Sequence, residues 1–132
     1  MIKILPEQFE NILPLAVKWA EAKEKVILEH GTALSPQYVE DAKLIGVEHP
    51  GKVRIYEVPQ IPNPKHPVLK AASEATQLIS PATIGISCGY GIFIHDDFSQ
   101  DRYTIVHELV HTMQFKQGGL PTSQHQKPSK NP

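Results

Sequence analysis

Two histidines and a glutamate have a spacing that suits a metal site: His107 and His111 are four residues apart, and Glu108 directly follows the first. Residues four apart lie on one face of an α-helix, so both imidazoles can reach the same ion. Glu108, beside the first histidine, can reach a water molecule on that ion. The spacing therefore predicts a metal site with an acid–base group on one helical turn.

This arrangement favours hydrolysis by a zinc-activated water molecule. Catalytic zinc typically has three protein ligands and a fourth position for water, whose pKa falls to about 7. We expect one Zn²⁺ ion held by His107 and His111, with Glu108 as the general base that takes the proton and passes it to the leaving amine. The middle residues, Leu109 and Val110, are uncharged, which suits a helix packed against a domain.

The metal motif lies in a segment that should be helical, from about residue 99 or 101 to residue 117. Acidic residues precede this segment and two glycines follow it, as expected for the start and end of a helix. The residues just upstream predict a β-hairpin, with strands over 83–88 and 91–95 around a glycine-bearing turn.

The second strand of this hairpin is expected to border the metal site, because only a short loop separates it from the helix. An exposed strand edge can bind an extended segment through main-chain hydrogen bonds. We therefore expect a peptide or protein substrate to pair with this strand. The predicted substrate-binding edge consists of Gly91, Ile92, Phe93 and Ile94.

The N-terminal half predicts the framework that positions the motif. Apolar residues three and four apart favour a helix over 6–30, and Ser35-Pro36 favours the start of a second helix that ends at Gly46. Alternation predicts a half-buried strand over 52–58, and a third helix follows over 67–78. The expected core consists of Trp19, Val53, Ile55, Ile84, Ile86, Ile92, Ile94, Ile105, Leu109 and Val110.

The composition excludes several classes of protein. The 132 residues include 13 basic and 14 acidic side chains, a balance that argues against binding to nucleic acid or an anionic membrane. One cysteine, Cys88, excludes an intrachain disulfide. With neither signal peptide nor transmembrane segment in the sequence, we expect a cytoplasmic domain over 1–119 and a disordered polar tail over 120–132. The oligomeric state is not specified by the sequence.

The motif resembles that of the zincin superfamily of metallopeptidases. More closely, residues 89–95, 106–115 and 118–119 are similar to segments of a group of small bacterial metallopeptidase-like proteins of unassigned activity. Residues 53–55 with 61–62 resemble the same group, so the similarity reaches about residue 119. The resemblance implies an α+β, zincin-like fold. In that fold, N-terminal helices pack on a small, mostly antiparallel sheet, and the helix with the motif lies across it.

The chain departs from the zincin pattern after Gly119. Zincins with a glutamate as third ligand carry it on a further helix, but no Asp or Glu lies between Thr112 and Pro132 here. The histidine-type pattern needs Gly at position 114 and His at position 117, where this chain has Gln114 and Gln117. The sequence therefore resembles a zincin core cut off at its C-terminus.

Three sources of a third ligand remain open. His125, in the tail, could fold back toward the helix. His95, at the end of the predicted edge strand, is a second source, together with Asp96 or Asp97. A second chain, or a two-histidine site completed by water, is the third. Near the motif, Gln114 could orient a ligand or contact the hairpin, and Tyr90 could pack over the turn or face a substrate.

Two functions stand as hypotheses. The first is a zinc-dependent, metallopeptidase-like hydrolase with Glu108 as general base. The alternative is a catalytically inactive or truncated zincin relative that acts as a metal-binding or protein-interaction module, with strand 91–95 holding a partner's extended segment without cleaving it. The presence or absence of a third ligand discriminates between the two.

Overall fold

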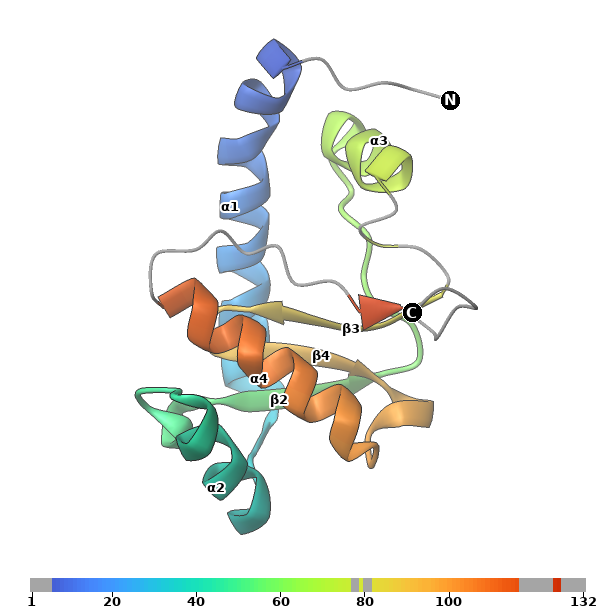
Figure 1. The fold of residues 1–132 in the computed structure, drawn as a ribbon. Coiled ribbons are helices and arrows are strands. Elements are labelled where there is room, and N and C mark those ends of the chain that lie inside the picture. Colours follow the sequence, from blue (N-terminus) through green and yellow to red (C-terminus); the bar gives the residue numbers. More distant parts are fainter. Residues whose placement is uncertain (1–5, 77–78, 80–81, 117–124, 127–132) are drawn as a thin grey trace.

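The structure is a computed structural model that describes residues 6–76, 79, 82–116 and 125–126. Within these residues it contains four α-helices and one mixed five-stranded sheet, which confirms the expected α+β class (Figure 1). The helices are α1 (Pro6–His30), α2 (Pro36–Ile45), α3 (Pro67–Thr76) and α4 (Arg102–Lys116). The strands are β1 (Thr32–Ala33), β2 (Arg54–Val58), β3 (Thr83–Cys88), β4 (Gly91–His95) and β5 (His125–Gln126), and the short 3-10 helices are η1 (Pro50–Lys52) and η2 (Asp96–Phe98).

The capping signals of the sequence work as predicted at α2. The Ser35 hydroxyl accepts a hydrogen bond from the backbone N–H of Tyr38 at 3.4 Å, and Pro36 occupies the first turn. At the other end, Gly46 adopts a left-handed conformation with φ 106°, which lets its N–H reach the carbonyls of Ala42 and Lys43. The predicted start and stop of this helix are both confirmed.

The helix that carries the metal motif is fixed at its N-terminus by two carboxylates. Asp101 accepts a hydrogen bond from the backbone N–H of Thr104 at 3.3 Å, which caps α4. The Arg102 guanidinium donates to both carboxylate oxygens of Asp41, at 3.1 and 2.8 Å. Since Asp41 belongs to α2, this bidentate pair sets how α4 lies against α2.

The strand order is β1-β2-β4-β3-β5. The predicted hairpin is present, because β3 and β4 pair antiparallel with Ile86 opposite Phe93. However, β4 also pairs in parallel with β2, with Ile55 opposite Ile92. The prediction of a free substrate-binding edge at Gly91, Ile92, Phe93 and Ile94 is therefore wrong: both edges of β4 are hydrogen-bonded to other strands.

The second edge of β4 is covered because β4 pairs with β2, a segment far from it in the sequence. The chain leaves β2, passes through α3 and β3, and returns β4 to the side of β2 (Figure 1). The sequence did contain a sign of this interior position. Ile92, Phe93 and Ile94 are all buried, and an uninterrupted apolar run is typical of a strand covered on both faces.

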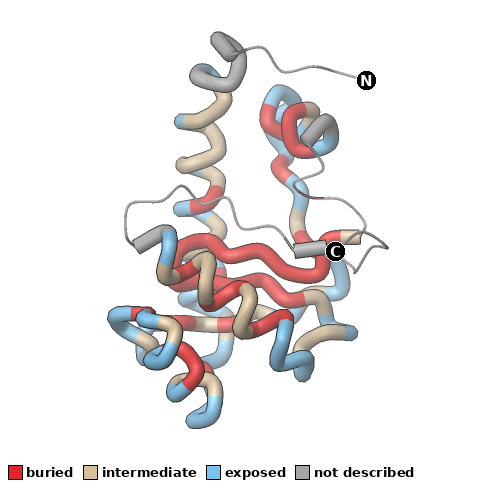
Figure 2. The backbone as a smooth tube through the Cα atoms, in the orientation of Figure 1, coloured by how far each residue is buried: buried red, intermediate tan, exposed pale blue. Residues whose placement is uncertain are grey.

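Two hydrophobic clusters cover the two faces of the sheet, and buried residues concentrate in the central strands (Figure 2). The cluster on the α2 and α4 face contains Ile92, Ile94 and Leu109. The cluster on the α1 face contains Ile27 and Phe93. All members of the expected core are buried except Trp19 and Val110, which are half-buried.

The segment expected to be a disordered tail, 120–132, falls outside the described residues except at β5. There, His125 pairs antiparallel with Gly85 and Gln126 with Thr83, with a β-bulge or similar irregularity between Thr83 and Gly85. In the part of the chain that the structure describes, no helix combines the length and the apolar character needed to cross a membrane.

Candidate metal centre

Helix α4 presents the residues of the metal motif in two directions. Thr104, Glu108 and Thr112, each four residues from the next, have exposed fractions of 0% and face the sheet. His107 and His111 lie on a neighbouring side of the helix and are half-buried. Glu108 directly follows His107, about 100° further around the helix, and precedes His111 by three residues, about 60° in the other direction.

The two histidines converge as ligands of one ion would. Their Nε2 atoms lie 3.2 Å apart, and the rings meet edge to face with centroids 4.8 Å apart. Two nitrogens at about 2.0–2.1 Å from a tetrahedral zinc ion are separated by about 3.3 Å. The observed separation fits this value, and in the metal-free protein the same distance permits one imidazole to donate a hydrogen bond to the other.

Gln114 orients the second histidine. Its side-chain Oε1 lies 3.2 Å from Nδ1 of His111, a contact that is satisfied when Nδ1–H donates to the amide oxygen. This tautomer leaves the Nε2 lone pair of His111 directed toward His107. Partial burial, and next the nearby His107, lower the pKa of His111, so the neutral imidazole that a metal requires is favoured. Of the two roles considered for Gln114, the geometry supports orientation of the His111 ring.

The side chain of Glu108 lies between its own helix, α4, and strand β3, and it has no exposed surface. The Ser87 hydroxyl is 2.8 Å from its carboxylate Oε1 and 2.8 Å from its main-chain oxygen. Burial raises the pKa of Glu108 to about 7, although the hydrogen bond from Ser87 acts in the opposite direction. A carboxyl group that titrates near neutral pH can both take up and release a proton there, as acid–base catalysis requires.

The face of β3 under Glu108 is built from small residues: Thr83, Gly85 and Ser87. A side chain at Gly85 would enter the space of the carboxylate, because a Cβ there would lie 3.1 Å from Glu108 Oε2 and 3.3 Å from its Cγ. The glycine thus makes room for Glu108. No local pattern links Gly85 or Ser87 to the motif, since both lie more than twenty residues before Glu108 in the sequence.

The structure separates the proposed third ligands. The His95 Nδ1 accepts a hydrogen bond from the backbone N–H of Asp97 at 3.1 Å, and its ring packs against Phe98. Asp96 and Asp97 are exposed in η2. Among the described residues, no three His, Cys, Asp or Glu side chains gather closely enough to hold a metal ion, so His95 does not join His107 and His111. The backbone of His125 pairs with Gly85 of β3, and its side chain lies outside what the structure describes.

Of the two roles considered for Tyr90, the structure confirms packing, and a second tyrosine, Tyr103, lies near the motif. Tyr90, considered for substrate contact, is buried in the core cluster with Val53, and its backbone N–H donates to Glu24 at 2.7 Å. Tyr103 was not identified, yet its ring lies 6.2 Å from that of His107 and is 69% exposed. Its position one helical turn before His107 was the available signal.

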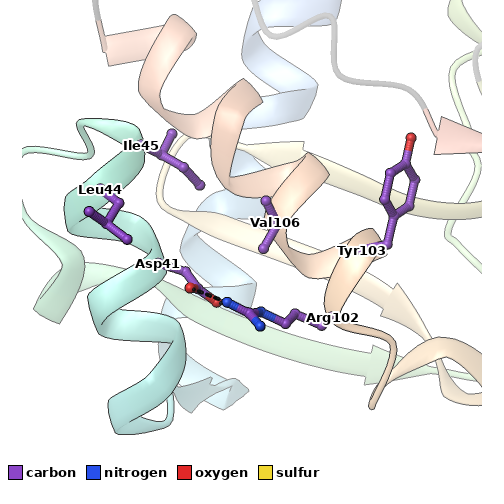
Figure 3. A pocket seen from close by; sticks show the side chains of 6 residues that line it. All are labelled: Asp41, Leu44, Ile45, Arg102, Tyr103 and Val106. Atoms are coloured by element: carbon purple, nitrogen blue, oxygen red, sulfur yellow. Dashed lines mark hydrogen bonds and ion pairs between the residues drawn. The ribbon is translucent and has the colours of Figure 1, made fainter.

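A separate shallow groove of about 480 Å³ lies between α2 and α4. Its lining consists of Asp41, Leu44, Ile45, Arg102, Tyr103 and Val106. Figure 3 shows the Tyr103 side chain on the side of α4 away from Leu44 and Ile45, which come from α2. None of the three motif residues lines this groove, but Tyr103, which does, lies with its ring 6.2 Å from that of His107.

Comparison of the chain with protein-family models, with curated proteins and with solved structures finds no match.

Proposed function

We propose that this chain is a zinc-dependent, peptidase-like hydrolase with a zincin-like fold, acting on a peptide or protein. The observation that carries the proposal is the convergence of the His107 and His111 Nε2 atoms at 3.2 Å, on a helix that places Glu108 beside them. The spacing of four residues brings the two rings within reach of each other, and the contact of Gln114 with Nδ1 of His111 adds an orientation that suits binding through Nε2.

The side chains divide the work of binding and orientation. His107 and His111 would hold one zinc ion through Nε2, and Gln114 would keep His111 in the tautomer that can bind. When bound, zinc supplies a Lewis acid and lowers the pKa of a water molecule to about 7. The apolar contacts of Leu109 beneath the helix hold the histidine side of α4 in place, because Leu109 is fully buried in the core cluster.

Glu108 would move the proton. Its carboxylate is next in sequence to His107 and accepts the proton of the attacking water, and the protonated acid then donates to the leaving amine. Ser87 positions Oε1 through its 2.8 Å hydrogen bond, and Gly85 leaves room for Oε2. Proton uptake and release by one carboxyl group is efficient because its pKa lies at about 7.

The test combines metal binding with hydrolysis. Calorimetric titration of the metal-free chain with zinc should show one site, which His107→Ala or His111→Ala removes and the control His49→Ala, an exposed histidine, retains. Glu108→Gln should keep zinc but lose hydrolysis of a mixed fluorogenic peptide library, by about 100-fold or more. The exposed control Glu57→Gln should retain full activity. Absence of zinc binding in the unaltered chain would refute the proposal.

A second function is favoured by the complete burial of Glu108: a metal-binding module without catalysis. A base with no exposed surface meets a water molecule only if the neighbouring segments open. In this case zinc would bind as above, but the unaltered chain and Glu108→Gln would show the same background hydrolysis. Strand 91–95 does not offer an edge to a partner's extended segment, because β4 pairs with β2 on one side and with β3 on the other.

A further inference from the structure

We propose that the groove between α2 and α4 binds the C-terminal residue of a peptide that ends in a large aliphatic side chain. The apolar lining of the groove holds that side chain, and the Arg102 guanidinium holds the terminal carboxylate. Such a site goes beyond the proposed function, because it needs no metal. Three features support it: the size of the groove, its apolar lining, and the hydrogen-bond donors that Arg102 retains.

The groove has an apolar lining that is partly open to solvent. Leu44 and Ile45 of α2 lie on one side of it and Val106 of α4 on the other (Figure 3). The Leu44 residue is 86% exposed, so it loses contact with water when a ligand enters. The volume of about 480 Å³ lies within the range of about 300–1,000 Å³ that is typical of ligand sites. An aliphatic side chain placed here is stabilised by the hydrophobic effect.

The Arg102 guanidinium supplies the polar end of the groove. Its Nε and Nη2 donate to the Asp41 carboxylate, and among the described residues no other hydrogen bond of Arg102 is found. A guanidinium has five N–H donors, so the edge formed by Nη1 and the second N–H of Nη2 remains for another acceptor. The two oxygens of a carboxylate match such an edge in the same way as those of Asp41 match the first one.

The Asp41–Arg102 pair presents its positive member to solvent. The Arg102 side chain is 59% exposed, whereas the Asp41 side chain is 9% exposed. An incoming anion therefore meets N–H groups rather than the Asp41 carboxylate. The groove thus complements a negative charge next to an apolar group, because Arg102 and Leu44 line the same space. A C-terminal aliphatic residue carries both groups on one Cα atom.

The experiment uses the full chain without metal, because Tyr103 brings the groove close to His107 and bound zinc would add a second site. Nuclear magnetic resonance follows the isotope-labelled chain during titration with acetyl-Ala-Ala-Leu, which has a free carboxylate. The shifted resonances should belong to α2 and α4 around the groove. The same peptide with a C-terminal amide should bind at least about 10-fold more weakly, since it lacks the charge-assisted hydrogen bonds. Acetyl-Ala-Ala-Ala should also bind more weakly, since its last side chain buries less apolar surface.

Two variants assign the contacts. Leu44→Gln should weaken the binding of acetyl-Ala-Ala-Leu by about 5-fold or more, whereas Leu28→Gln, the same change at an exposed leucine of α1, should not alter it. Arg102→Lys keeps a cation beside Asp41 but loses the planar pair of donors, so the preference for the free carboxylate over the amide should fall. Should Arg102→Lys unfold, as circular dichroism would show, the comparison of acid and amide on the unaltered chain decides.

Equal affinity for the acid and the amide, shifts confined to other elements, or no shifts at millimolar peptide would overturn the inference. The titration contains no metal and measures no hydrolysis, so each of these outcomes leaves the proposed function standing. Conversely, a chain that binds the acid selectively but binds no zinc would keep this site and lose the proposed function.

Discussion

The hydroxyl of Ser87 lies 2.8 Å from both the main-chain oxygen and the carboxylate Oε1 of Glu108. A hydroxyl has one proton, so it cannot donate fully to two acceptors. If Glu108 is protonated, its O–H can donate to Ser87 while Ser87 donates to the main-chain oxygen. Both contacts are then satisfied, which agrees with a carboxyl group whose pKa is raised by burial to about 7.

The first prediction concerns this contact. Ser87→Ala removes the hydrogen bond that acts to lower the pKa of Glu108 and leaves two buried oxygens without this donor. We expect the free energy of unfolding to fall by about 1–3 kcal/mol. Urea denaturation measures the loss, with Ser99→Ala, at the end of η2, as the control. A Ser87→Ala variant as stable as the control would show that the contact contributes nothing.

The second prediction concerns the space beneath Glu108. Gly85→Ala places a methyl group 3.1 Å from Oε2 of Glu108 and 3.3 Å from Cδ1 of Ile94. Because both neighbours are buried, we expect the free energy of unfolding to fall by about 1–3 kcal/mol. Gly51→Ala is the matched control, since nothing lies within 4 Å of the added carbon. Equal stability of the two variants would argue that Glu108 can move aside freely.

The third prediction is a pH dependence of the metal-free protein. The pKa of Glu108 is raised from 4.5 to about 7 on folding, so between these values the folded state keeps a proton that the unfolded state has released. The free energy of unfolding should therefore fall as pH rises through this window, by at most about 3 kcal/mol.

Other groups also titrate in this range, so the measured quantity is the difference between the unaltered chain and Glu108→Gln, followed by urea denaturation at several pH values. This difference should fall between pH 4.5 and about pH 7 and level off above it. A difference that stays flat, or that rises with pH, would contradict a raised pKa.

The fourth prediction concerns Cys88, whose side chain is 1% exposed in the cluster on the α1 face. Burial, together with Glu24 and Glu108, raises its pKa to about 12. At pH 8 only about one thiol in ten thousand is then ionised, so iodoacetamide should label the folded protein very slowly. Mass spectrometry follows the labelling, and addition of urea should make it fast. Rapid labelling of the folded chain would mean that this cluster opens readily.

The sequence predicted the elements whose signals are local. Ser35 and Gly46 define α2, and the glycine-bearing turn after Cys88 predicts the hairpin of β3 and β4. The same holds for the histidine pair, because a spacing of four residues on a helix fixes the relation of His107 to His111. In each case the geometry depends on residues that are only a few positions apart in the sequence.

The remaining features depend on distant residues. The parallel pairing of β2 with β4 joins Ile55 to Ile92, and no pattern within either strand encodes the partner. The Ser87 contact with Glu108 likewise spans 21 residues. Periodicity indicates which face of an element is buried but not what covers it, so closeness in sequence to α4 could not reveal that β2 pairs with the other edge of β4.

The position of β4 between β2 and β3 has a consequence for how this fold can vary in length. Side chains alternate between the two faces, so a residue inserted in the turn at Gly89 would exchange the faces of Ile92 and Phe93. The shift would disturb the pairing with β2 and with β3 together. Insertions should therefore be excluded from this turn yet accepted in the connector between β2 and α3, whose length sets no register.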